Sequence, residues 1–165
     1  MRGRKLGVAW ITVLACVASL TTAESAFAAL GDMSLLTTNA AGVKGNGHNQ
    51  APSWSADGQR VAFDSLSDNL DPADLDPYPD IYVKDIGTGD LYFASTDASG
   101  ANGDGASFNP SLSGNGNLVA FQSMSTNLSS LDTDQTYDVF VKNLTTGQVT
   151  LVSETGGVKG ALSAA

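Results

Sequence analysis

The stretch at residues 51–65 reads APSWSADGQRVAFDS, and residues 109–123 repeat it as NPSLSGNGNLVAFQS. The two copies are offset by 58 positions, and the match at this offset continues as far as Ser95 and Ser153 (153 − 95). A fixed offset held over this distance predicts two copies of one structural unit, arranged one after the other along the chain.

Each unit is predicted to contain four short strands, tight turns and one long loop. Apolar and polar side chains alternate in residues 60–65, which is typical of a half-buried strand. Asp57 and Gly58 before them favour a tight turn, because glycine adopts positive φ and aspartate bonds its own backbone. No segment after the first 28 residues has a credible helical period. The expected strands are residues 52–55, 60–65, 80–85 and 90–96 in the first unit and 109–113, 118–123, 138–143 and 148–153 in the second.

A unit of this kind cannot bury both faces of its own sheet, and four short strands per unit is the pattern of a β-propeller blade. The motif PSWSADGQRVAF at residues 52–63, followed by DIYVKD at residues 80–85, resembles the WD40-like repeat of TolB-like β-propeller proteins, the PD40-type repeat. The second copy departs from the motif near Gly114 and returns to it with DVFVK at residues 138–142. The resemblance covers nearly all of residues 42–154 and implies an all-β fold of two four-stranded antiparallel blades.

The ends of the chain predict that the propeller is partial. Residues 34–39 match the fourth strand of each unit and are expected to form a lone strand, while residues 157–160 repeat residues 42–45. A closed propeller needs about 4 to 8 blades, so two leave it open. We expect part of a longer propeller, or a chain that closes by assembling copies, with apolar surface on both outer faces. The predicted boundaries are a signal peptide at 1–28 and a partial TolB-like propeller at 29–165, with blade one at about 42–98, blade two at about 99–155 and the start of a further repeat at 156–165.

The first 28 residues are predicted to be a secretory signal peptide. Basic residues at positions 2, 4 and 5 precede a mostly apolar run at residues 6–20, and residues 26–28 read AFA, a spacing that signal peptidase cleaves. The apolar run is shorter than the roughly 18 to 20 residues of a membrane span. Cleavage after Ala28 would make the protein secreted or periplasmic. Alternatively, VLAC ending at Cys16, the one cysteine, matches a lipoprotein signal that would anchor the chain.

The net charge limits the classes of partner. The whole chain carries −9, and loss of the first 28 residues removes three basic residues and one acid, which leaves about −11. Such a charge repels phosphate backbones and anionic lipid. We therefore expect no nucleic-acid partner and no binding to a membrane surface, and the short apolar run predicts no membrane span. Cations or basic protein partners are favoured.

The long loop before each third strand is the candidate metal site. Clustered carboxylates at short spacing can bind a hard cation such as Ca²⁺ through oxygen. The pattern is not an EF-hand, because the glycine at the sharp turn and the bidentate glutamate are absent. The alternative is a solvated loop whose aspartates make turn hydrogen bonds and brace the strand start. The candidate calcium ligands are Asp74, Asp76 and Asp80, and at the same spacing Asp132, Asp134 and Asp138.

The sequence carries no recognisable catalytic constellation. His48 is the one histidine, and the second unit has Ala106 in its place, so no orienting partner is evident. No Gly-x-Ser-x-Gly elbow occurs. Proteins with the repeat that this chain resembles bind partner proteins in the cell envelope. The sequence therefore favours a non-enzymatic protein-interaction scaffold in the bacterial envelope or outside the cell. The alternative is a cation- or ligand-binding propeller part of a larger extracellular hydrolase.

Overall fold

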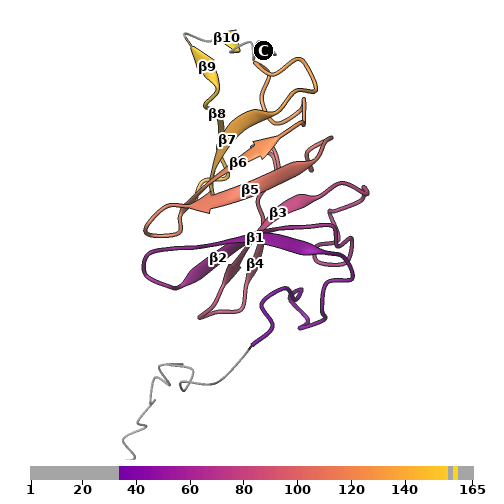
Figure 1. The fold of residues 1–165 in the computed structure, drawn as a ribbon, viewed down its shortest axis with the longest axis vertical. Coiled ribbons are helices and arrows are strands. Elements are labelled where there is room, and N and C mark those ends of the chain that lie inside the picture. The colour runs from indigo at the N-terminus through magenta and orange to yellow at the C-terminus, as the bar shows by residue number, and fades with distance from the viewer. Residues whose placement is uncertain (1–33, 156–157, 160–165) are drawn as a thin grey trace, which may run out of the picture. The chain divides into compact units, whose positions relative to one another are not determined.

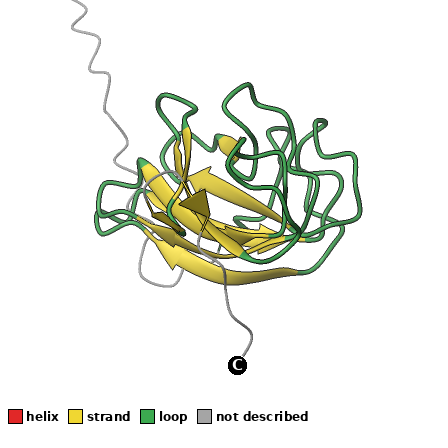
Figure 2. Ribbon diagram, turned by 90° about the horizontal axis from the view of Figure 1, so that it is seen from above, coloured by secondary structure: helices red, strands yellow, loops and turns green. Residues whose placement is uncertain are grey.

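The computed structural model describes residues 34–155 and 158–159, and this part of the chain consists of strands and loops without a helix (Figure 2). The signal peptide and the end of the predicted further repeat lie outside the described residues.

Two four-stranded antiparallel sheets have the orders β1-β2-β3-β4 and β5-β6-β7-β8, and β9 pairs with β10 (Figure 1). The two sheets do not close a ring, and the expected fold class is confirmed. The strands are β1 Asn49–Trp54, β2 Arg60–Ser65, β3 Asp80–Asp85, β4 Leu91–Phe93, β5 Ser107–Leu112, β6 Leu118–Ser123, β7 Asp138–Asn143, β8 Val149–Leu151, β9 Glu154–Thr155 and β10 Val158–Lys159.

The two central strands of each sheet coincide with the predicted ranges, whereas the outer strands differ. The fourth strands, β4 and β8, are shorter than expected, and β1 and β5 begin earlier. Pro52 was expected at the start of a strand but lies inside β1, where the register shifts between Gln50 and Ser53. A proline has no N–H for the ladder, so the chain bulges there. The bulge brings Ala51 to φ 47°, and Asn109 has φ 55° at the same place in β5.

The expected lone strand at residues 34–39 is wrong. Thr38 forms only an isolated bridge with Lys44. The reason is a local turn: the Asn39 side chain accepts the backbone N–H groups of Ala41 and Val43, which curls the chain before it can pair as a strand.

A shared core lies between the two sheets. Strand β5 contacts β1, β2 and β3 of the first sheet. Because side chains alternate along a strand, one face of β2 and β3 turns toward one face of β6 and β7. The buried apolar residues of this core are Ala62, Ile81, Val83 and Ala94 from the first sheet and Val119, Phe121, Leu128, Phe140 and Leu151 from the second.

Residues 34–45 lie against the other face of the first sheet. The Lys84 ammonium there donates to the backbone O of Thr38 at 3.1 Å and to its Oγ1 at 3.3 Å. The Lys142 ammonium donates in the same way to Thr96 O at 3.0 Å and Oγ1 at 2.9 Å. Residues 34–45 therefore occupy, on the first sheet, the position that the end of the first unit occupies on the second.

The expectation of exposed apolar outer faces is wrong for the first sheet and confirmed for the second. Phe63 and Tyr82 on the outer face of the first sheet are 3% and 0% exposed. On the outer face of the second sheet, Val139 is 38% exposed and Val152 is 50% exposed. No helix within the described ranges is long and apolar enough to span a bilayer.

Candidate functional site

The acidic loop of the first sheet brings three predicted ligands together. Asp74 and Asp76 lie in the loop between β2 and β3, and Asp80 is the first residue of β3. Each offers one carboxylate oxygen, and the three oxygens lie within 4.8 Å of one another. Asp74 and Asp80 are only 5% and 1% exposed, and Asp76 is half-buried. The loop is therefore not simply solvated, because two of its carboxylates are buried.

Hydrogen bonds hold one oxygen of each buried carboxylate in place. The Ser95 hydroxyl donates to Asp80 Oδ1 at 2.6 Å, and the Tyr82 hydroxyl donates to Asp74 Oδ2 at 2.7 Å. Ser95 Oγ in turn accepts the N–H of Ile81, so Asp80 does brace the start of β3. The second oxygens, Asp80 Oδ2 and Asp74 Oδ1, are buried and have no hydrogen-bond partner. Orphaned buried acceptors of this kind are uncommon in folded proteins.

The third carboxylate is tied to the next segment of the chain. Asp76 Oδ1 accepts the backbone N–H of Tyr78 at 2.8 Å, and Asp76 Oδ2 accepts the Asn102 side-chain N–H at 2.8 Å. Asn102 belongs to the loop that leads from β4 to β5. The acidic cluster is thus connected to the segment that carries the chain from the first sheet to the second.

The cluster is electrostatically costly without a positive charge. Burial, followed by the charges of Asp74 and Asp76, raises the pKa of Asp80 to about 8, although the Ser95 hydrogen bond opposes the shift. Burial likewise raises the pKa of Asp74, against the hydrogen bond from Tyr82. Within the described part of the chain, no lysine, arginine or histidine forms an ion pair with these carboxylates.

The second sheet has the same arrangement with two differences. Carboxylate oxygens of Asp132, Asp134 and Asp138 also lie within 4.8 Å of one another. Ser153 donates to Asp138 Oδ1 at 2.7 Å, as Ser95 does to Asp80. However, Asp134 is exposed, and Phe140 stands where the first sheet has Tyr82, so it has no hydroxyl to donate.

A cavity gives solvent access to the first cluster. Its volume is about 560 Å³. Three of its six lining residues are aspartates, and hard cations prefer carboxylate oxygens as ligands. The donor set therefore fits a hard divalent cation better than a soft transition metal. The cavity is lined by Leu66, Asp68, Asp74, Leu75, Asp76 and Pro77.

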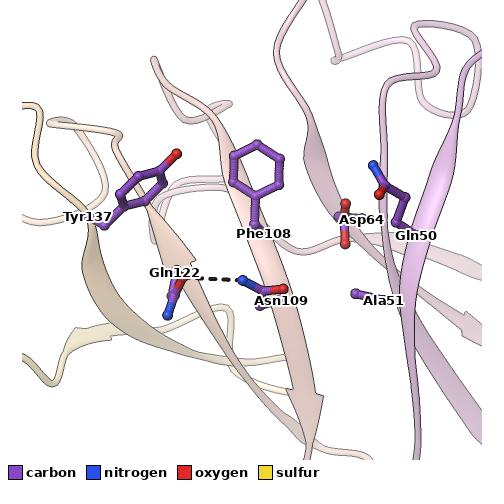
Figure 3. Close-up of a pocket in the computed structure, with 7 residues that line it drawn as sticks. All are labelled: Gln50, Ala51, Asp64, Phe108, Asn109, Gln122 and Tyr137. Atoms are coloured by element: carbon purple, nitrogen blue, oxygen red, sulfur yellow. Dashed lines mark hydrogen bonds between the residues drawn. The ribbon is translucent and has the colours of Figure 1, made fainter.

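A second candidate site is a pocket of about 390 Å³ between the first strands of the two sheets, which sequence reasoning missed (Figure 3). Six of its lining residues form three pairs that are equivalent in the two units. The 58-residue offset was therefore a signal that could have identified these pairs. The rings of Phe108 and Tyr137 are tilted, with centroids 6.3 Å apart. The pairs are Gln50 with Phe108, Ala51 with Asn109, and Asp64 with Gln122; Tyr137 completes the lining.

The polar groups of this pocket come from the bulged strands. Asn109 Nδ2 donates to Gln122 Oε1 at 3.3 Å, which Figure 3 shows as a dashed line. Asp64 is 3% exposed, and burial raises the pKa of its carboxyl, opposed by backbone amides including that of Asn109. Amides and a carboxylate beside two aromatic rings suit a polar ligand.

His48 lies immediately before β1. Its side chain is exposed, and its backbone carbonyl accepts the N–H of Leu66. Neither the acidic cluster nor the inter-sheet pocket includes it. The described residues therefore give it no catalytic geometry.

Comparison with known proteins finds no matching family model and no matching curated protein. Among solved structures, the chain is similar to TolB from Acinetobacter baumannii, with 24% identity over 64% of this chain and 21% of that one, and a TM-score of 0.41. It is also similar to a protein assigned as TolB from Agrobacterium tumefaciens, with 20% identity over 73% of this chain and 33% of that one, and a TM-score of 0.46. The chain thus spans a third or less of these structures.

Proposed function

We propose that this chain is a non-enzymatic protein-binding scaffold that works outside the cytoplasm, and that the outer face of its second sheet is the docking surface. This surface comprises the side chains of β6, β7 and the end of β8 that point away from the first sheet. The residues of the outer face are Leu118, Ala120, Gln122, Val139, Val141, Asn143, Thr150 and Val152.

One observation supports the proposal: the same face of the first sheet is buried. Ile81 and Ala94 are each 0% exposed because the second sheet covers them. Their counterparts at the 58-residue offset, Val139 and Val152, are 38% and 50% exposed. A face that is built for burial in one unit and uncovered in the next is a typical protein interaction site.

We expect a second copy of the chain to cover this face with its own outer face. The chain is strongly acidic, at −9, yet no member of the outer face is charged. Two such faces can therefore pack together without repulsion between carboxylates. Sheet-on-sheet packing through one shared apolar patch is the geometry of a two-fold dimer.

Light scattering over a range of protein concentrations tests this. We expect the purified chain to form dimers, and Val139→Lys to be monomeric, because a lysine ammonium would be trapped without a counter-charge between two uncharged faces. Gln59→Lys is the matched control, since Gln59 is exposed at the turn before β2 and away from the outer face.

Two results would overturn the proposal. One is a wild-type chain that remains monomeric at every concentration. The other is a dimer that Val139→Lys and Gln59→Lys weaken equally, since the charge change alone would then account for the effect.

The location outside the cytoplasm rests on the predicted signal peptide with cleavage after Ala28, or on lipidation at Cys16. Pulse labelling that finds the leader uncleaved would contradict it. The alternative is a cation- or ligand-binding propeller part of a larger extracellular hydrolase. The acidic cluster supports the cation binding in this alternative but gives no support to the hydrolase.

A further inference from the structure

We propose that Asp74, Asp76 and Asp80 form a calcium-binding site at the start of β3, and that Asn102 positions Asp76 in it. The proposal does not depend on the outer face of the second sheet. It rests on atoms inside the first unit and on the loop that joins the two units.

The orphaned oxygens carry the argument. Asp74 and Asp80 are more than nine-tenths buried, and each has one oxygen fixed by a hydroxyl and one without a hydrogen-bond partner. Because the first oxygen is held, neither carboxylate can rotate to satisfy the second without breaking a bond. A bound cation would satisfy such an acceptor.

The spacing fits one cation. Oxygens bound to the same Ca²⁺ at about 2.3 to 2.6 Å can lie at most about 5 Å apart. The three carboxylate oxygens already lie within 4.8 Å of one another. The ligands therefore need little rearrangement, and the remaining coordination positions can be taken by water from the adjoining cavity.

Charge and ligand type select the metal. Three carboxylates in a partly buried cluster repel one another, and a divalent cation offsets this repulsion. Ca²⁺ accepts irregular sets of protein oxygens, whereas Mg²⁺ demands a near-ideal octahedron and keeps most of its waters. We therefore expect calcium to bind more tightly than magnesium.

Asn102 gives the site a structural consequence. Its amide holds Asp76 at 2.8 Å from the loop between the two sheets. At the other end of the acidic loop, the Ser107 N–H donates to the Pro79 carbonyl at 2.8 Å. A cation in the cluster would thus tie the acidic loop to the start of β5 and strengthen the junction between the sheets.

The test uses the full purified chain, freed of metal with EDTA and then supplied with CaCl₂ or MgCl₂. We expect calcium to raise Tm by several degrees and magnesium to raise it much less. Terbium is the spectroscopic probe: Tyr82 donates to Asp74, so excitation of tyrosine should sensitise Tb³⁺ emission, and excess calcium should quench it.

Three variants make the test specific. Asp80→Asn keeps the shape of the side chain and removes its charge, so the calcium effect should disappear while the metal-free Tm does not fall. Asn102→Ala should weaken calcium binding roughly tenfold with little change in the metal-free Tm. Asp90→Asn, which removes one charge from the β3–β4 turn, should behave as the wild type.

The proposal is overturned if calcium leaves the wild-type Tm unchanged, or if Asp80→Asn gains as much from calcium as the wild type does. Should Asp80→Asn fail to fold, Asp76→Asn replaces it, because Asp76 is only half-buried. Terbium emission from Asp76→Asn equal to that of the wild type would then refute the site.

Discussion

The two sheets share their strand order and the register of their central strands, yet their equivalent faces have different neighbours. Ile81 and Val139 occupy the same position in β3 and β7, but Ile81 is 0% exposed and Val139 is 38% exposed. The second sheet covers the face that holds Ile81, while none of the described residues buries Val139 to the same degree. The repeated sequence therefore determines the strand order and register of each sheet. The segments that pack against a sheet determine which of its faces are buried.

Truncation at this matched pair should give the largest difference. Ile81→Ala removes a fully buried side chain from the core between the sheets and should lower the free energy of unfolding by about 2–5 kcal/mol. Val139→Ala, on the partly exposed face, should cost less than about 1 kcal/mol in the monomer. Urea denaturation of both variants at low protein concentration measures the contrast, and equal losses would show that Val139 is buried in solution.

The two buried lysines give an intermediate contrast. Lys142 donates to Thr96 O and Oγ1 and, at 2.7 Å, to the backbone O of Asp97, whereas Lys84 has only the two acceptors on Thr38. Replacing either lysine by methionine keeps the apolar stem but leaves acceptors unsatisfied.

We expect Lys142→Met to lower the free energy of unfolding by about 1–3 kcal/mol, because it orphans more buried acceptors. Lys84→Met should cost less. The same urea experiment provides the measurement. A greater loss in Lys84→Met would mean that residues 34–45 stabilise the first sheet more than the end of the first unit stabilises the second.

The features that recur in both units could be predicted from the sequence. The 58-residue offset and the alternation of residues 60–65 helped to place the central strands to the residue. The aspartate spacing identified which carboxylates lie together, because the loop ends at a strand whose position was already known. These features depend on local sequence, and so they could be read from it.

The remaining features depend on contacts between segments. The turn made by Asn39 competes with pairing of residues 34–39, and a strand pattern does not reveal that competition. Asn102 matches Lys44 at the offset, so the repeat gave no sign that it would hold Asp76. The inter-sheet pocket likewise exists only once β1 and β5 lie side by side.

Arg60 offers the smallest contrast between the two units. Its substitution tests one set of polar contacts between the two sheets. Its Nε lies 3.2 Å from Asp85 Oδ2, and its Nη1 donates to Gly116 O at 3.1 Å and to Asn117 Oδ1 at 3.0 Å. The guanidinium carbon also lies 5.2 Å from the centroid of the Tyr92 ring. One side chain thus links the first sheet to the β5–β6 turn of the second.

In the second unit a leucine, Leu118, replaces this arginine, and Arg60→Leu makes the first unit match it. The Arg60 and Asp85 side chains are 19% and 16% exposed, and the bonds to the second sheet require the planar guanidinium. We expect a loss of about 1–2 kcal/mol in the free energy of unfolding. Arg60→Lys keeps the positive charge but lacks the planar guanidinium, and it should lose more than half as much free energy of unfolding as Arg60→Leu. If Arg60→Leu unfolds at the wild-type urea concentration, the guanidinium contributes nothing measurable to holding the two sheets together.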